Sequence, residues 1–276
     1  MTAVNLKTLL NKANRNNYAI AGLVVITWED ALAYTEAADE TGIPIILQAG
    51  PSCRAFTPIS VLGKMFRYLA EQTKTHVCCH IDHGYTIREC VEGIDSGFTS
   101  VMFDGSKLSL KENIKVTSKI VKKAHMAKVS VEGEIGFVGY ANSKSSEGTL
   151  TDEAISFAKN SGVDAMAISV GNTHLQTNKV AKIDIAKIKQ IQKSTSTPLV
   201  LHGGSGIPNR IRKKLAKETN VAKFNIGTEL RMTFGNAIRK QVKNNPRIYD
   251  RLQLLKPTIP EITKITKKII KNFGPQ

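Results

Sequence analysis

Residues 75–86 read THVCCHIDHGYT, and this stretch indicates the class of fold. The apolar run at its start predicts a short buried strand. A strand of this kind ordinarily opens into a turn of small polar residues, but here it ends in His80, Asp82 and His83, followed by Gly84. Acidic and imidazole side chains at the end of a buried strand are typical of α/β proteins, in which functional groups gather at the carboxyl ends of parallel strands.

The rest of the chain repeats the same alternation of strand and helix. The eight expected strands span 18–26, 43–48, 76–81, 100–103, 129–134, 165–169, 198–201 and 222–226. The helices expected between them span 29–41, 58–73, 86–96, 110–126, 151–160, 183–193 and 208–217, and the segments 228–242 and 260–272 follow the last strand. Eight strands that are each followed by a helix predict an α/β fold, a (β/α)8 TIM barrel. An open doubly wound sheet is the alternative, but the regularity of the units and the lack of a Gly-rich first turn favour closure.

Length and composition agree with one large domain. The chain has 276 residues, of which 41% are hydrophobic, so it can bury a large core. At about 100–200 residues per domain two domains are allowed, but α/β barrels commonly reach about 250 residues as one domain. Because no linker or low-complexity segment divides the sequence, we expect residues 1–276 to form a single TIM-barrel domain.

The sequence also indicates the cellular compartment in which the protein is expected. Segment 1–18 is amphipathic and lacks the apolar block of a signal peptide. The longest apolar stretch, 19–26, is far shorter than the roughly 18 residues that a membrane span requires. The four cysteines show neither a CxxC motif nor a disulfide framework, so we expect them to be free thiols. These features predict a cytoplasmic protein that does not bind membranes.

The formal net charge of +16 raises the question of nucleic-acid binding. In the segments 119–128, 210–217 and 264–271, lysines interleave with apolar residues at helical spacing, which is typical of the solvated faces of helices. Aromatic residues make up only 6% of the chain, and no stacking platform accompanies the charge. We therefore expect no nucleic-acid partner, and a positive field that gathers phosphorylated small molecules.

Three histidines follow three different predicted strands. His83, His174 and His202 fall at strand ends that a barrel brings to one rim. A single histidine at such a position is more often an ordinary hydrogen-bonded residue, but three of them favour a shared Zn²⁺ ion, because a catalytic zinc keeps three protein ligands and one open position. His80, within the strand, is expected to support the ligands or the core.

Carboxylates accompany the histidines. Asp82 is placed either to act as a general acid and base or to orient a ligand imidazole, and its spacing does not separate the two roles. Asp104, Glu132 and Glu134 form a second acidic group, in which the two glutamates share one face of a strand. This group predicts a second metal position or a ligand-orienting role, with salt bridges to lysines as the alternative.

Two loops rich in small residues follow the last two strands. They are HGGSG at 202–206 and NIGT at 225–228, and they offer the hydroxyl groups of Ser205 and Thr228. In barrels these loops frequently bind phosphate through backbone N–H groups and a helix N-terminus.

These motifs resemble the class II, metal-dependent ketose-bisphosphate aldolase family over almost the whole chain. The resemblance rests on blocks such as CHIDHGYT, VSVEGEIG, SGVDAMAISVGNTH, PLVLHGGSGIP and VAKFNIGTELR, in that order. The block NIGTEL is similar to tagatose-bisphosphate members rather than fructose-bisphosphate members, which usually carry an acid where Gly227 stands.

The resemblance implies a function and a set of roles. It implies a cytoplasmic aldolase that cleaves a phosphorylated ketose, fructose- or tagatose-bisphosphate-like, to dihydroxyacetone phosphate and an aldehyde, and that forms homodimers or homotetramers. The implied cofactors are one catalytic Zn²⁺, a second position for the metal, and a monovalent cation at the phosphate site of some members. The implied metal ligands are His83, His174 and His202, with Asp104 and Glu134 at the second position. Asp82 would be the acid and base, and the phosphate and the enediolate would bind Gly203, Ser205, Asn225, Gly227 and Thr228, with Lys223 near the other phosphate.

The sequence departs from the family at three places. The first strand ends in LVVIT at 23–27, where the family usually has an Asn-containing pattern. His174 is followed by Leu175 where the family usually has glycine, and Asn142 stands where a mobile-loop glutamate usually moves the carbon-bound proton. Glu147 is the expected substitute for that glutamate. Two alternatives therefore stay open: a metal-dependent hydrolase or isomerase, and a catalytically weakened barrel that binds sugar phosphates. The lack of a His-x-His pair on the first strand counts against a metallohydrolase.

Overall fold

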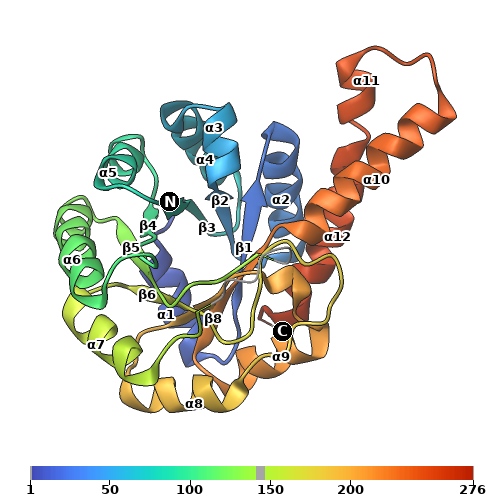
Figure 1. Cartoon of the computed structure of the whole chain (residues 1–276). Helices are drawn as coiled ribbons and strands as arrows, with labels where there is room; N and C mark the ends of the chain where they lie inside the picture. Colours follow the sequence, from blue (N-terminus) through green and yellow to red (C-terminus); the bar gives the residue numbers. More distant parts are fainter. Residues whose placement is uncertain (1, 141–146, 276) are drawn as a thin grey trace.

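The computed structural model describes residues 2–140 and 147–275, and their strands close into a barrel. All eight strands are parallel and pair in sequential order, with β8 closing against β1, which confirms the predicted TIM barrel (Figure 1). The strands are β1 (Ile20–Val25), β2 (Ile45–Ala49), β3 (Val77–Gly84), β4 (Ser100–Phe103), β5 (Ser130–Ile135), β6 (Ala165–Ile168), β7 (Leu199–Leu201) and β8 (Val221–Ile226).

Helices surround the barrel (Figure 1). They are α1 (Leu6–Arg15), α2 (Trp28–Thr41), α3 (Pro51–Phe56), α4 (Ile59–Gln72), α5 (Ile87–Asp95), α6 (Leu110–Met126), α7 (Thr151–Ser161), α8 (Ile185–Ser194), the 3-10 turn η1 (Gly204–Gly206), α9 (Asn209–Glu218), α10 (Thr228–Asn244), α11 (Arg251–Leu255) and α12 (Thr258–Phe273). Across the described part of the chain, no helix combines the length and apolar composition needed to cross a membrane.

Helix α1 closes one end of the barrel. The N-cap residue of α1 is Asn5. Its side-chain oxygen, Oδ1, accepts a hydrogen bond from the Thr8 N–H at 3.0 Å and so satisfies a free donor of the first turn. One face of the helix packs Leu6 and Leu10 against inward-facing strand residues such as Ile20. Because this amino-terminal end is filled by apolar side chains, chemistry is left to the carboxyl ends of the strands.

The barrel interior changes from apolar to polar along each strand. On β3, Cys78 belongs to the apolar cluster beside α1, His80 lies two residues further on, and Asp82 reaches the cavity at the carboxyl end. This order follows from the period of two along a strand, which sends every second side chain into the barrel. The same period sends Glu132 and Glu134 of β5 inward, and both are buried.

Candidate active site

A cavity of about 320 Å³ opens among the carboxyl ends of the strands and the loops that follow them. Its walls are formed by Val24, Gly50, Pro51, Ser52, Asp82, His83, Tyr85, Tyr140, His174, Leu175, Gly203, Ser205, Asn225, Gly227, Thr228 and Arg231. A larger hollow of about 1140 Å³ lies among residues that precede β1, β2 and β3, such as Tyr18, Pro44 and His76. It contains none of the predicted site residues, so the smaller cavity is the candidate site.

An irregularity in β3 aims two neighbouring side chains at the cavity. Regular alternation would turn His83 away from the barrel interior when Asp82 points into it. The pairing of β3 with β4 shifts register between Ile81 and Gly84, and His83 adopts a left-handed φ of 51°. This backbone costs about 1–2 kcal/mol for a residue with a side chain, and it lets both Asp82 and His83 line the cavity.

Arg54, on the short helix α3, holds this irregular backbone in place. One terminal nitrogen, Nη1, donates to the carbonyl oxygens of Ala49 at 2.7 Å and Asp82 at 2.6 Å. The other, Nη2, donates to the carbonyl of His83 at 2.9 Å and pairs with Glu89 at 3.2 Å. Sequence reasoning missed Arg54 and α3, although Pro51 after Gly50 is a signal for the first turn of a helix.

The three predicted histidines converge. The ring of His83 lies 4.6 Å from that of His202 and 5.3 Å from that of His174, between centroids, and the remaining pair is 5.5 Å apart. One nitrogen of each ring lies within 4.8 Å of the others, a set that can hold a metal ion. Burial lowers the pKa of His202 well below its usual range and the pKa of His174 to about 4, with the charge of His83 adding to the effect on both. Both rings are therefore neutral at pH 7 and offer lone pairs.

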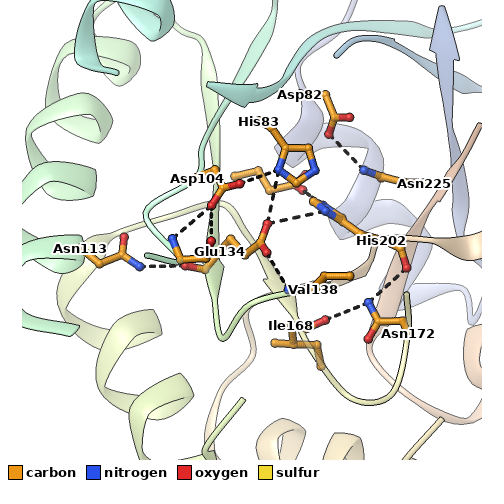
Figure 2. A network of polar contacts seen from close by, with 12 residues as sticks. Asp82, His83, Asp104, Asn113, Glu134, Val138, Ile168, Asn172, His202 and Asn225 are labelled. Carbon is orange, nitrogen blue, oxygen red and sulfur yellow. Dashed lines mark hydrogen bonds and ion pairs between the residues drawn. The ribbon is translucent and has the colours of Figure 1, made fainter. Parts of the chain in front are cut away.

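A second group of possible ligands adjoins the first. His83 Nδ1 lies 2.7 Å from Asp104 Oδ2 and 3.6 Å from Glu134 Oε2, so these three side chains can also hold a metal (Figure 2). Burial and the charge of Asp104 raise the pKa of Glu134 to about 8. Burial alone would lower the pKa of His83, but Asp82, Asp104 and Glu134 raise it to about 10. To hold a metal, His83 and Glu134 must lose their protons, and the negative charge of Asp82 and Asp104 beside them favours a cation in their place.

Two buried atoms support the fit to a metal. In the described part of the chain, neither His202 Nδ1 nor Glu134 Oε2 finds a hydrogen-bond partner. A buried polar atom without a partner costs about 1–3 kcal/mol, which a bound cation would offset. Imidazole nitrogens and carboxylate oxygens are the donors that zinc takes in catalytic sites. The residues present therefore fit a divalent metal.

Two asparagines hold the backbone around these ligands (Figure 2). Asn172 donates to the carbonyl oxygens of His202 at 3.1 Å and Ile168 at 3.3 Å. Asn113 donates to the carbonyl of Glu134 at 2.8 Å. Both amides are buried, and both join segments that are distant in the sequence, so spacing alone gave no signal for them.

Asp82 carries a negative charge at the edge of this cluster. Asn225 Nδ2 donates to Asp82 Oδ1 at 3.1 Å (Figure 2). Burial would raise the pKa of Asp82, but the neighbouring charges, His83 first, lower it below its usual range. The carboxylate is therefore ionised at neutral pH and lines the cavity beside the histidines.

The loops after β7 and β8 form one end of the cavity. Gly203 has a left-handed φ of 63°, and a Cβ there would fall 2.1 Å from the carbonyl oxygen of Thr173, so only glycine fits. Ser205 Oγ accepts from the N–H groups of Gly227 at 3.3 Å and Glu229 at 3.2 Å. The cavity-facing start of α10 and the cation of Arg231 add positive charge, which favours an anion.

The structure places two of the predicted residues away from the cavity wall, and a third lies outside the described residues. Lys223, expected near a phosphate, is fully buried in the barrel, where its Nζ lies 2.6 Å from Glu132 Oε2, so the structure does not bring it to the cavity. Glu147 is exposed, pairs through its backbone with Phe137 and is not among the residues that line the cavity. Asn142 lies outside the described residues.

Leu175 and two tyrosines shape the rest of the wall. Leu175 has a φ of 58°, in the left-handed backbone region that favours glycine. Leucine therefore stands where the family usually has glycine, but the backbone keeps a conformation suited to glycine. Tyr140 stacks on His174 with ring centroids 5.1 Å apart, and Tyr85 stacks on His83 at 6.4 Å. Sequence reasoning did not single out either tyrosine.

Comparison with known proteins gives one consistent result. A sequence profile described as "Fructose-bisphosphate aldolase class-II" matches residues 4–276. A fructose-bisphosphate aldolase of Staphylococcus aureus (strain Mu50) is 34% identical over 281 residues, which cover 99% of this chain and 98% of the relative. One from Geobacillus stearothermophilus is 32% identical over 282 residues, with 99% and 98% covered. The crystal structure of the YdjI aldolase from Escherichia coli K12 matches with a TM-score of 0.87 at 28% identity and covers 99% of this chain and 97% of that one.

Proposed function

Because the chain belongs to the class II fructose-bisphosphate aldolase family, a family of zinc-dependent carbon–carbon lyases, we propose that it cleaves a phosphorylated ketose reversibly. The products are dihydroxyacetone phosphate and an aldehyde. The observation that carries the proposal is the meeting of three imidazoles, an ionised Asp82 and the small-residue loops after β7 and β8 in one cavity.

We assign the metal to the three histidines. His83, His174 and His202 would hold zinc, and Asp104 and Glu134, with His83, would provide a second position. Zinc, when bound, supplies a Lewis acid that draws electrons from the substrate ketone. Asp104 also accepts a hydrogen bond from His83 Nδ1, which directs the other nitrogen, Nε2, away from the carboxylate.

Asp82 performs the proton transfer that breaks the carbon–carbon bond. Its carboxylate takes the proton of the hydroxyl group on the carbon that becomes the aldehyde, and that oxygen then forms the new C=O bond. The electron pair of the broken bond stays on the carbon next to the ketone and must then be protonated to give dihydroxyacetone phosphate. Asn225 holds Asp82 through one oxygen, Oδ1, and leaves the other for the substrate. We propose Glu147 as the source of the carbon-bound proton, which requires its exposed side chain to swing into the cavity that it does not line in this structure.

The phosphate of the substrate binds at the end of the cavity formed by Gly203, Ser205, Gly227 and Thr228. The positive end of the α10 helix dipole favours the phosphate, and Ser205 Oγ, which accepts from the N–H groups of Gly227 and Glu229, holds the two loops together. Arg231, which sequence reasoning missed, supplies the positive charge.

Replacing Arg231 by Gln should weaken the phosphate subsite. A charge-assisted contact to phosphate contributes about 1.5–3 kcal/mol, so we expect KM for the phosphorylated ketose to rise about 10–100-fold with little change in kcat or zinc content. Steady-state kinetics with a fixed zinc supply measure both. Arg239→Gln, on the same helix but outside the cavity wall, is the matched control. An unchanged KM in Arg231→Gln would remove this arginine from the subsite.

The substrate is tested by a panel of ketose mono- and bisphosphates, with zinc supplied and triose-phosphate release as the readout. Release from fructose or tagatose bisphosphate would identify the sugar, and release from a monophosphate would move the assignment to a different sugar phosphate. Binding of sugar phosphate with no release from any member of the panel would favour the second candidate, a catalytically weakened binding barrel. The left-handed Leu175 beside His174 is the observation behind that candidate.

A further inference from the structure

A connected network of polar side chains lies inside the barrel beneath the three histidines. Lys223 Nζ lies 2.6 Å from Glu132 Oε2 and 3.4 Å from His80 Nε2. Glu132 Oε1 lies 3.1 Å from His202 Nε2, and His80 Nδ1 lies 2.9 Å from Ser100 Oγ. All five residues are fully buried, and only His202 has a place in the proposed mechanism.

We propose that Glu132 is a positioning residue that fixes His202 in the tautomer with its proton on Nε2, and that Lys223, bonded to the other carboxylate oxygen of Glu132, holds that carboxylate against His202. The inference rests on the proposed metal site, because its consequence is that Nδ1 of His202 presents a bare lone pair to zinc.

The tautomer follows from what each group can donate. A neutral imidazole carries one N–H, and an ionised carboxylate only accepts hydrogen bonds. Since Glu132 Oε1 is within hydrogen-bond distance of His202 Nε2, the proton must be on that nitrogen. Nδ1 is then unprotonated, and it is the atom of His202 that is buried without a hydrogen-bond partner in the described structure. Ligand histidines in metal sites are commonly held in this way through their second nitrogen.

Lys223 and His80 complete the chain of donors and acceptors. An ammonium group only donates, so Lys223 gives hydrogen bonds to Glu132 and to Nε2 of His80. His80 Nδ1 must then carry its proton and donate to Ser100 Oγ. Lys223 Nζ lies 2.6 Å from Glu132 Oε2, so the ion pair fixes one oxygen of the carboxylate and leaves the other, Oε1, facing His202.

The competing explanation is that the Lys223–Glu132 pair only stabilises the barrel. The two explanations differ in what a neutral replacement of the whole pair does. Apolar residues of similar volume often replace a buried ion pair without loss of folding stability, so Glu132→Leu combined with Lys223→Met should fold. In that variant His202 Nε2 has lost its acceptor, and nothing selects the tautomer.

The first experiment measures zinc affinity by competition with a chromophoric chelator and the thermal unfolding of the zinc-free protein. We expect the double variant to bind zinc about 10–100-fold more weakly than wild type, at similar stability of the zinc-free form. A second double variant combines Glu132→Gln with Lys223→Met. The amide oxygen of the glutamine can still accept a hydrogen bond from His202 Nε2, so this variant should recover part of the zinc affinity. Unchanged zinc affinity in the folded double variant would overturn the proposal.

Asp164→Asn is the matched control. Asp164 is also a buried carboxylate in contact with a histidine and a lysine, His125 at 2.8 Å and Lys7 at 3.1 Å, but it lies outside the cavity. We expect this change to lower folding stability and to leave zinc affinity unchanged. A loss of zinc affinity as large as that in the double variant would favour the purely structural explanation.

The second experiment reads the tautomer directly. Zinc-free wild-type protein labelled with ¹⁵N-histidine should give imidazole ¹⁵N shifts for His202 of the Nε2–H form, assigned by the loss of those signals in His202→Gln. A proton on Nδ1 would overturn the proposal whether or not the double variant folds. A protein that binds zinc and shows the expected tautomer, yet cleaves no ketose phosphate, would refute the proposed function and support this inference.

Discussion

Dialysis against a strong chelator should abolish aldol cleavage by this protein, and added zinc should restore it. The metal contributes several kcal/mol to the stabilisation of charge in the transition state, and each factor of ten in rate corresponds to about 1.4 kcal/mol, so the expected loss is about a thousandfold or more. The residues that would bind the ion converge from β3, the loop after β6 and the end of β7, and none of them can stand in for it as a Lewis acid. The measurement is triose-phosphate release before and after zinc is returned, with metal content determined in parallel.

A histidine variant shows whether the loss comes from this site. His174→Ala should remove zinc and activity together, because it leaves two of the three imidazoles. His125→Ala is the control, since His125 lies at the end of α6, outside the cavity, and pairs with Asp164 at 2.8 Å. Full cleavage activity in metal-free protein would contradict the zinc mechanism, and full zinc content in His174→Ala would place the ion elsewhere.

The sequence predicted the barrel because its local signals agree. Every one of the eight strands lies where an apolar run predicted it, and β4 and α6 have the expected bounds. The motif resemblance to the class II aldolases is confirmed by the match over residues 4–276. The largest error in the predicted strand boundaries is at the end of β3, which was expected at residue 81 and lies at Gly84. Helices α3 and α11 were missed because each has only five or six residues and shows little periodicity, and α1 was not among the expected helices although segment 1–18 was recognised as amphipathic.

Residue type and strand order were enough to predict which histidines share the site. Contacts that depend on how the barrel closes could not be predicted from the sequence. The three histidines could be brought to one rim by counting strands, and the structure places them together. Which residue Lys223 contacts depends on how closure of the barrel sets β8 opposite β5, and its partner is Glu132, 91 residues away. The role of Arg54 depends on the left-handed backbone of His83, for which the sequence carries no glycine signal.

Replacing Asp82 by Asn should have the largest effect of any substitution that leaves the zinc site intact. General acid–base catalysis contributes about 10²–10⁴-fold, so we expect kcat to fall by that factor with zinc content unchanged. Asparagine keeps the shape of the side chain and can still accept the hydrogen bond from Asn225, but its amide takes no proton from the substrate hydroxyl. Steady-state cleavage assays with metal analysis of the same samples test this.

The alternative role for Asp82, orientation of a metal ligand, predicts a different pattern. The ring of His83 already has a carboxylate partner, because Asp104 Oδ2 lies 2.7 Å from its Nδ1. Asp82 is hydrogen-bonded instead to Asn225, so removal of its charge leaves the orienting contact of His83 in place. Asp152→Asn, an exposed change on α7, is the control for the loss of one negative charge. A large loss of zinc in Asp82→Asn with kcat preserved per bound zinc would assign Asp82 to the metal site and leave the proton transfer without a base.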